Sequence, residues 1–265
     1  MQTPSQSNVL SAAEHTIALL LAQARNVPQA DRDLRNGQWN RTRWEGVELH
    51  NKTLGIVGLG RVGVLVAQRA NAFGMQLVAH DPYVSAERAR QIGVDLVPTV
   101  EELVTRADFL TVHLPKTPDT IGLINAELLT HAKPTLRVVN TARGGIVDET
   151  ALADAVRDGR IAGAALDVFV EEPTTESPLF ELDSVVVTPH LGASTDEAQE
   201  KAGVSVAKSV RLALAGELVP DAVNVAGGII APDVRPGIPL MEKLGRIFTA
   251  MTHASLTQFD VEVAG

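Results

Sequence analysis

The stretch Leu54–Gly63 reads LGIVGLGRVG, in which a short apolar run leads directly into the glycine pattern Gly58-x-Gly60-x-x-Gly63. In a strand–turn–helix unit of this kind, the first glycine permits a tight turn. The second lets backbone N–H groups approach a pyrophosphate, and the third lets the helix pack closely on the strand. The helix N-terminus then faces an anion. The stretch therefore predicts the first βα turn of a dinucleotide-binding fold.

Composition limits the classes of protein to be considered. The 265 residues suffice for one or two domains, and 45% hydrophobic with 21% charged residues is typical of a globular protein. A net charge of −9 argues against non-specific binding to nucleic acid or to an anionic membrane, because both require basic surface. The absence of cysteine excludes disulfides and cysteine metal sites. No apolar run of membrane-spanning length and no signal peptide is present, so we expect a cytoplasmic protein.

From residue 52 onward, short apolar runs alternate with amphipathic helical stretches. The strands we expect are 54–57, 77–79, 94–97, 109–112, 136–140, 162–168 and 185–187. Such alternation predicts an α/β fold, with a Rossmann-type, doubly wound, mostly parallel sheet and helices on both faces.

The flanking segments are predominantly helical. Ser11-x-x-Glu14 has the form of a capping box that opens a helix, and a second helix is expected over 28–35. Trp39 and Trp44 are expected to pack against the core. A long helix is expected to follow Ser194.

We divide the chain into four parts. An N-terminal helical arm (1–51) precedes the Rossmann domain (52–193), and a return helix (194–226) leads to a linker and a partial C-terminal module (227–265). The linker proper is expected at 227–237. The partial module is expected to hold one amphipathic helix and a strand at 258–263.

Polar residues gather where the expected strands end, which is where open α/β sheets bind ligands. Asp81 comes 23 residues after Gly58, at the end of the second expected strand. An acidic residue there accepts hydrogen bonds from the ribose hydroxyls of NAD and repels the 2′-phosphate of NADP. The alternative is a turn aspartate before Pro82.

Three further strand ends carry side chains suited to acid–base chemistry. His190 follows the strand at 185–187, and a histidine is the usual proton carrier near neutral pH. Glu172 would favour the protonated imidazole and fix its tautomer, while Arg143 could hold a carboxylate with two parallel hydrogen bonds. Together they suit hydride transfer to and from a 2-hydroxy acid. The alternatives are a structural histidine and a solvent-exposed loop pair.

The remaining histidines do not predict a metal site. His15, His50, His80, His113, His131 and His253 have no ligand-like spacing. We expect a packing or interface role for His15. Neither a P-loop nor a G-x-S-x-G nucleophile turn is present.

From Ser11 onward the chain carries, in order, the motifs SAAEH, LGIVGLGRVG, HDPY, VHLPKTP, VVNTARGGIVDE, ALDVFVEEP and VVVTPHLGAST. In this combination it resembles the D-isomer-specific 2-hydroxyacid dehydrogenase family. The similarity continues through LALAGELVPDAVN and is greatest to members that oxidise D-3-phosphoglycerate to 3-phosphohydroxypyruvate in serine biosynthesis. Other D-2-hydroxy acids, such as glycerate or lactate, and formate-like substrates are the alternatives.

The resemblance implies NAD as the cofactor and gives roles to particular residues. His190 would take the proton of the substrate hydroxyl, with Glu172 as its partner and Arg143 as the substrate clamp. Asp167 would receive the nicotinamide carboxamide. The cofactor-binding set implied in this way is Gly58, Gly60, Arg61, Val62, Gly63, Asp81, Pro82, Thr141, Ala142, Arg143, Asp167, His190, Gly192 and Ala193.

The resemblance also implies a homodimer or a higher homo-oligomer, because the helix at 11–24 matches one that builds such an interface in the family. Family members carry an N-terminal lobe that completes the substrate pocket, and the phosphoglycerate type adds C-terminal regulatory modules. Neither is contained in these 265 residues. A dimeric NAD-binding module without turnover is therefore the alternative to an active enzyme.

Overall fold

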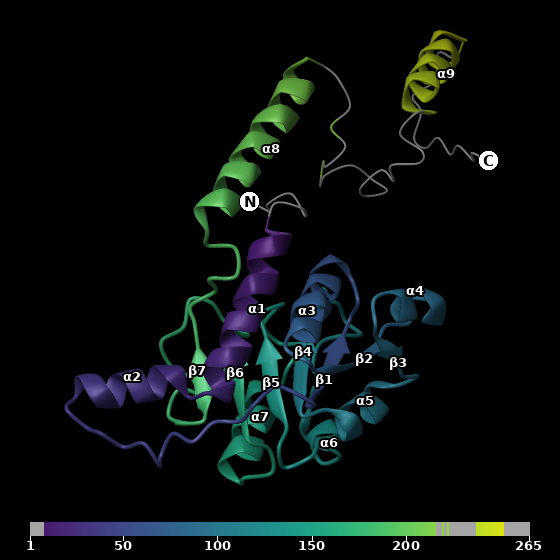
Figure 1. Ribbon diagram of the computed structural model, residues 1–265. Helices are drawn as coiled ribbons and strands as arrows, with labels where there is room; N and C mark the ends of the chain where they lie inside the picture. The colour runs from purple at the N-terminus through teal and green to yellow at the C-terminus, as the bar shows by residue number, and fades with distance from the viewer. Residues whose placement is uncertain (1–7, 216–218, 220–221, 223–236, 252–265) are drawn as a thin grey trace. The chain divides into compact units, whose positions relative to one another are not determined.

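The computed structural model describes residues 8–215, 219, 222 and 237–251. One compact unit lies within Ser5–Lys201, and a second begins at Ala202. The first unit holds a parallel sheet of seven strands (Figure 1). The predicted Rossmann-type α/β fold is therefore confirmed.

All of the expected strands are present, with small changes of length. They are β1 (Thr53–Val57), β2 (Gln76–His80), β3 (Asp95–Leu96), β4 (Phe109–Val112), β5 (Arg137–Asn140), β6 (Gly163–Leu166) and β7 (Val185–Val187). Their order is β3-β2-β1-β4-β5-β6-β7, so the direction of winding reverses between β1 and β4. Open α/β sheets bind ligands beyond the carboxyl ends of the strands at such a reversal.

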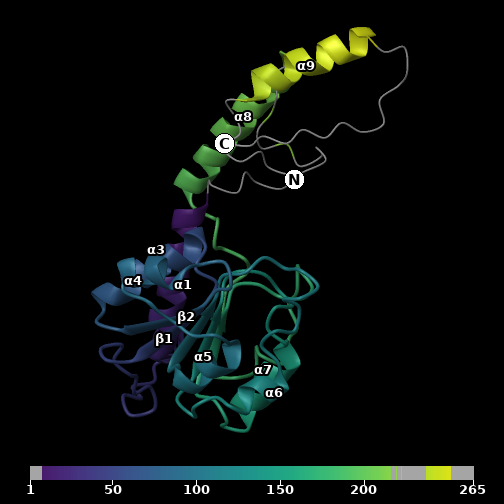
Figure 2. The same cartoon turned by 90° about the vertical axis from the view of Figure 1, so that its right-hand side faces the viewer.

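Helices cover both faces of this sheet. They are α1 (Val9–Ala24), α2 (Val27–Arg35), α3 (Arg61–Ala72), α4 (Ala86–Gln91), α5 (Val100–Arg106), α6 (Ala126–Leu129) and α7 (Glu149–Arg157). Side chains of α1, α3 and α4 pack with Ile56 and Val139 in one core, whereas those of α5, α6 and α7 pack with Val57 and Val138 in another. Successive strand residues point to opposite faces, which is why neighbours in sequence enter different cores. Figure 2 shows α1 and α3 on one side of the strands and α6 and α7 on the other.

Side-chain caps fix the starts of α5 and α7. Thr99 Oγ1 accepts the Glu102 N–H at 3.2 Å, and Asp148 Oδ1 accepts the Ala151 N–H at 3.0 Å. The capping box at Ser11 is wrong, because α1 begins two residues earlier at Val9. The Ser11 hydroxyl instead lies 2.8 Å from that of Thr195. It joins α1 to the segment that follows β7.

The expectation that both tryptophans pack against the core is wrong for Trp39, which is 76% exposed. Trp44 is half-buried, and its indole N–H donates to Asp33 Oδ2 at 2.8 Å. The guanidinium of Arg43 lies over the Trp44 ring. This loop is therefore fixed by polar contacts of Trp44, while Trp39 projects into solvent.

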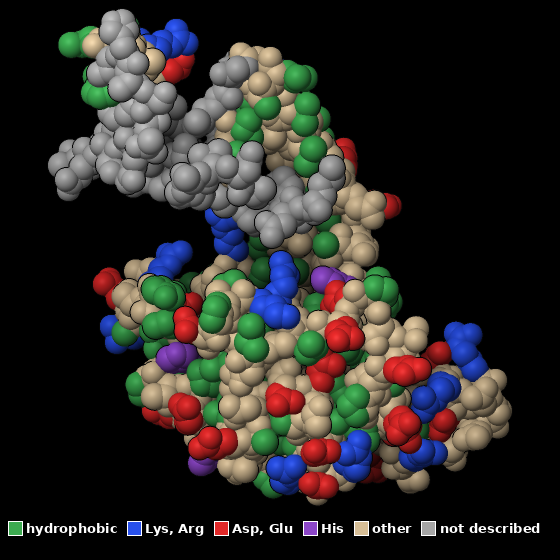
Figure 3. Space-filling model, turned by 180° about the vertical axis from the view of Figure 1, so that it is seen from behind, with side chains coloured by type: hydrophobic (Ala, Val, Ile, Leu, Met, Phe, Trp, Pro, Cys, Tyr) green, Lys and Arg blue, Asp and Glu red, His purple; other side chains and the backbone are tan. Residues whose placement is uncertain are grey.

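The predicted helix after Ser194 is present as α8 (Asp196–Leu214), and the amphipathic helix of the C-terminal part is α9 (Ile238–Met251). Apart from Gly237, the predicted linker lies outside the described residues, as does the predicted strand at 258–263. The four-part division of the chain stays a prediction. Among the described helices, none combines the length and the apolar character needed to cross a bilayer. Acidic and basic side chains are interspersed on the face shown in Figure 3.

Candidate active site

The glycine turn, residues 58–63, joins β1 to α3 as predicted. Gly58 has φ +95°, and a Cβ on it would lie 2.8 Å from the His113 carbonyl oxygen. A Cβ on Gly63 would lie 2.1 Å from the Gly58 carbonyl oxygen. Both positions therefore exclude a side chain.

Gly60 differs from its neighbours in the glycine turn, because no heavy atom lies within 4 Å of the position its Cβ would take. It is also the N-cap of α3, so it offers no side-chain acceptor to the first-turn N–H groups. The result is an open approach to a helix N-terminus, which is the donor arrangement that binds a pyrophosphate. The residues present thus fit a dinucleotide.

Asp81 lies beside the glycine turn at the end of β2. Its Oδ2 accepts the Leu59 N–H at 2.7 Å, and its Oδ1 accepts the Tyr83 N–H at 2.9 Å. A carboxylate oxygen can accept more than one hydrogen bond, so both oxygens keep capacity for a ligand. The contact with Leu59 fixes the carboxylate against the turn that would hold the pyrophosphate.

His190 and Glu172 form a direct pair. His190 Nδ1 lies 2.6 Å from Glu172 Oε2, and the other carboxylate oxygen of Glu172 accepts the Phe169 N–H at 2.8 Å. When Nδ1 carries the donated proton, Nε2 is left to accept a proton from a ligand. The two side chains are 48% and 31% exposed, so the pair is accessible.

Arg143 extends from the loop after β5 and is exposed. The amide of Asn140 fixes this loop, since its Oδ1 accepts the Ala142 N–H at 3.0 Å and its Nδ2 donates to the Arg143 carbonyl at 3.1 Å. Within the described residues, the guanidinium hydrogen-bonds only the Ala142 carbonyl. Arg143 therefore keeps most of its donors for a ligand, although it is not bonded to His190 or Glu172.

Asp167, at the end of β6, is completely buried and holds the segment that carries His190. Its Oδ1 accepts the Leu191 N–H at 2.7 Å and the Thr188 hydroxyl at 2.5 Å, and its Oδ2 accepts the Gly192 N–H at 2.8 Å. His15 Nε2 lies 3.1 Å from Oδ1. Burial raises the pKa of Asp167, but the hydrogen bonds from His15, Thr188 and the two N–H groups bring it below its ordinary value.

The structure gives His15 a role that sequence reasoning missed. Its Nε2 lies 3.0 Å from the Thr188 hydroxyl as well as against Asp167, so α1 helps to fix the segment before His190. Neither His15 nor Thr188 was among the predicted site residues. The motif SAAEH, which ends at His15, was the signal that could have indicated it.

The other predicted cofactor residues lie around these strand ends. Thr141 is buried, and its hydroxyl lies 2.6 Å from that of Thr16 on α1. Gly192 is buried against Asp167. Arg61, Val62, Pro82, Ala142 and Ala193 are partly or fully exposed at the same edge.

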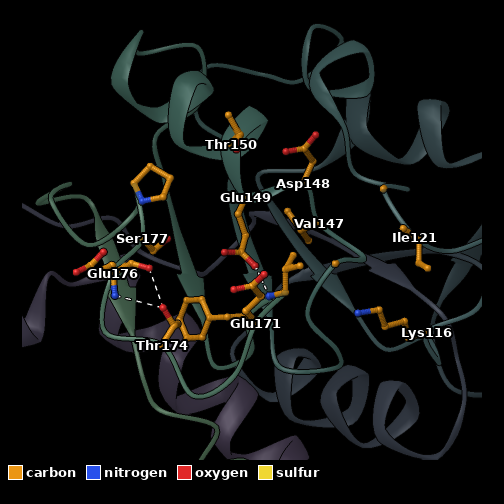
Figure 4. Close-up of a pocket in the computed structure, with 15 residues that line it drawn as sticks. Lys116, Ile121, Val147, Asp148, Glu149, Thr150, Glu171, Thr174, Glu176 and Ser177 are labelled. Carbon is orange, nitrogen blue, oxygen red and sulfur yellow. Dashed lines mark hydrogen bonds between the residues drawn. The ribbon is translucent and has the colours of Figure 1, made fainter.

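A pocket of about 590 Å³ is lined by the loops that follow β4, β5 and β6 (Figure 4). The loop after β5 also carries Arg143. Glu149, the first residue of α7, lies in its wall, and its carboxylate accepts the Val170 N–H at 2.6 Å. Chiefly burial, and then the charges of Asp148 and Glu172, raise the pKa of Glu149 despite that hydrogen bond and the charge of Lys116. The pocket was not predicted from the sequence.

His113 follows β4 next to the glycine turn. Its Nε2 lies 3.0 Å from the Thr111 hydroxyl, and burial lowers its pKa to about 4. The imidazole is therefore neutral at physiological pH. Among the described residues, no cluster of three or more His, Asp or Glu side chains is arranged to hold a metal ion.

Residues 17–192 match the sequence family described as "D-isomer specific 2-hydroxyacid dehydrogenase, NAD binding domain". The chain therefore belongs to the D-isomer specific 2-hydroxyacid dehydrogenase family and carries its NAD-binding domain. The family predicted from the motifs is confirmed.

Relatives of this chain carry the name D-3-phosphoglycerate dehydrogenase. The chain is 56% identical over 259 residues to a D-3-phosphoglycerate dehydrogenase of Mycobacterium bovis, covering 98% of this chain and 49% of the relative. It is 46% identical over 264 residues to the Synechocystis enzyme of the same name, covering 98% and 47%. It thus spans about half the length of these relatives. Among solved structures, D-lactate dehydrogenase from Aquifex aeolicus with NAD and lactic acid matches at 28% identity and a TM-score of 0.73, covering 80% of this chain and 68% of that one.

Proposed function

We propose that this chain acts in the NAD-dependent oxidation of D-3-phosphoglycerate to 3-phosphohydroxypyruvate. The observation that carries the proposal is the His190–Glu172 pair, 2.6 Å between Nδ1 and Oε2, at the same sheet edge as the open glycine turn. The substrate is inferred from the names of the M. bovis and Synechocystis relatives. The pathway it would serve is serine biosynthesis, in the cytoplasm.

Cofactor binding would use backbone and one carboxylate. The first-turn N–H groups of α3, beyond Gly60, would hold the pyrophosphate, and Asp81 would accept hydrogen bonds from the adenosine ribose. A 2′-phosphate would meet the same carboxylate, so NAD is favoured over NADP. Bound NAD would supply the hydride acceptor for C2 of the substrate.

Proton transfer would be the task of His190. As the C2 hydride leaves, Nε2 accepts the proton of the C2 hydroxyl, while Nδ1–H stays bonded to the Glu172 carboxylate, which stabilises the imidazolium. General acid–base catalysis of this kind contributes roughly 10²–10⁴ in rate. In the reverse reaction the same proton returns to the forming hydroxyl.

Arg143 would hold the substrate carboxylate. Its guanidinium has donors free for a bidentate contact, and its loop is fixed by Asn140. The loop also touches that of Glu172, because a Cβ on Gly144 would lie 1.7 Å from the Phe169 carbonyl oxygen. Clamp and acid–base pair are thereby held on contacting loops.

A homodimer through the N-terminal arm is part of the proposal. Exposed apolar side chains on this arm support it, since Val27 is 54%, Leu34 57% and Trp39 76% exposed. Light scattering after size-exclusion chromatography tests it. The expected mass is twice 28.1 kDa, and a monomer would contradict it.

The activity is tested on the purified chain in two stages. NADH is first titrated while energy transfer from the tryptophans to the nicotinamide is followed, and 3-phosphohydroxypyruvate is then added while NADH absorbance is recorded. We expect binding followed by oxidation, with slower oxidation when pyruvate or glyoxylate replaces the phosphorylated acid. NADH that binds but is not oxidised would contradict the proposed activity of this chain, and equal rates would contradict the substrate.

A further inference from the structure

The short segment after β6 that leads to Glu172 is held at two consecutive peptide N–H groups by two different carboxylates. The Phe169 N–H donates to Glu172 Oε1 at 2.8 Å. The next N–H, that of Val170, donates to Glu149 Oε1 at 2.6 Å. Hydrogen bonds to a charged acceptor are about twice as strong as neutral ones. The backbone at 169–170 is thus fixed by one carboxylate from its own loop and one from α7.

The same backbone has no room to move toward the loop of Arg143. A Cβ on Gly144 would lie 1.7 Å from the Phe169 carbonyl oxygen and 2.7 Å from the Val170 nitrogen. The peptide between Phe169 and Val170 therefore packs directly on the backbone of Gly144. Release of the Val170 N–H would remove the hydrogen bond that holds this peptide to α7.

Figure 4 shows Glu149 extending from the start of α7 into the pocket, toward the loop that carries Glu171. Glu149 is half-buried, whereas Glu172 and His190 are more exposed. The charged groups that act on Glu149 are Asp148, Glu172 and Lys116. A half-buried carboxylate with a short hydrogen bond is better ordered than an exposed one, so it is suited to hold the loop of its partner.

We propose that Glu149 is a positioning residue for Glu172: by fixing Val170 it places the adjacent Phe169 N–H, which in turn orients the carboxylate that binds His190. This inference rests on the proposed function, because Glu149 would affect catalysis only through the His190–Glu172 pair. Glu149 itself contacts neither His190 nor, within the described residues, the glycine turn.

Two substitutions in the 265-residue chain separate reach from charge. Glu149→Asp keeps the negative charge at the α7 N-terminus, where it is favourable, but its shorter side chain does not reach Val170. Glu149→Gln loses the charge but keeps an oxygen that can accept the Val170 N–H. Glu176→Ala is the control, because Glu176 lines the same pocket while its hydrogen bonds to Thr174 are made by its backbone.

The primary readout is the ¹⁵N chemical shifts of the His190 ring, which report the nitrogen that carries the proton and require no turnover. We expect Glu149→Asp to reduce the share of the Nδ1–H form and to lower kcat for 3-phosphohydroxypyruvate reduction by about 10- to 100-fold, the range expected for a small misplacement. The Kd for NADH should change less than about twofold. Glu149→Gln and Glu176→Ala should both show the ring shifts of the wild type.

Wild-type ring shifts in Glu149→Asp would overturn the inference. So would the opposite ranking, with Glu149→Gln altered and Glu149→Asp normal, because charge rather than reach would then matter. Glu172→Gln distinguishes this failure from that of the proposed function. If Glu172→Gln lowers kcat while Glu149→Asp does not, only the inference fails; if Glu172→Gln leaves kcat unchanged, the proposed function fails.

Discussion

The glycine turn (residues 58–63) and the His190 corner (Asp167, Glu172, Thr188 and His190) stand at the same edge of the sheet but are held in different ways. The turn is shaped by backbone contacts that leave no room for a Cβ at Gly58 or Gly63. The corner is held by the carboxylates of Asp167 and Glu172, which accept hydrogen bonds from backbone N–H groups and from the Thr188 hydroxyl. Substitutions in the turn therefore act through steric clashes, whereas substitutions in the corner act through lost charge and hydrogen bonds.

We expect the largest effect from a side chain added at Gly63, where the glycine turn has no room for a Cβ. Gly63→Ala places a Cβ 2.1 Å from the Gly58 carbonyl oxygen. We expect a loss of about 3 kcal/mol in the free energy of unfolding and at least about 100-fold weaker NADH binding. Chemical denaturation and NADH titration measure these. Gly60→Ala is the matched control: it should fold normally, because its Cβ meets nothing within 4 Å, yet bind NADH more weakly.

In the corner, Asp167→Asn keeps the shape but removes the buried charge. An amide offers fewer acceptor sites to Thr188, Leu191 and His15, so we expect a loss of about 3 kcal/mol and a fall in Tm of roughly 10 °C. Asp183→Asn is the control, because Asp183 is 51% exposed in its pairs with Arg32 and Arg43; its Tm should fall by less than about 3 °C. Equal losses in the two variants would contradict the importance of the corner.

The turn and the strand beside it also carry an acid-sensitive element. Burial lowers the pKa of His113 to about 4 from 6.5, so the unfolded chain takes up the proton first as the pH falls. The free energy of unfolding is therefore highest above pH 6.5, the pKa of His113 in the unfolded chain, and it falls between pH 6.5 and pH 4. His113→Asn should reduce the loss of unfolding free energy between about pH 7 and pH 5 by about 2 kcal/mol. Identical pH profiles of urea unfolding would contradict this.

Asp81 gives the smallest expected effect, since backbone N–H groups still hold the pyrophosphate. Asp81→Ala should weaken NAD binding by about 10-fold. NADP binding should not weaken, because the variant lacks the carboxylate that repels the 2′-phosphate, so the preference for NAD relaxes. Asp95→Ala, which removes one exposed charge from the neighbouring strand β3, controls for net charge. An unchanged ratio of the two dissociation constants would count against a ribose contact.

The same contrast explains how much could be predicted from the sequence. The strands and the glycine turn were predictable because their signals are local, with apolar runs and glycines at fixed spacing. The contact of His15 with Asp167 was not, because 152 residues separate them and no pattern pairs them. Trp39 was misplaced for a related reason, since an aromatic residue in a polar loop carries no signal for the direction in which it points.

The pair of His190 and Glu172 was proposed from strand ends, and the structure brings these two side chains together at 2.6 Å. Their catalytic roles, like those of Arg143 and the cofactor residues, stay predictions. Glu149 escaped notice because its interaction is with a backbone N–H, which has no sequence signature.

The most direct test measures the dissociation constant for NADH and the turnover of 3-phosphohydroxypyruvate together, in the wild-type chain and in His190→Ala. We expect the variant to bind NADH as tightly as the wild type, within about twofold, while kcat falls by roughly 10²- to 10⁴-fold. Turnover retained in His190→Ala would contradict this expectation.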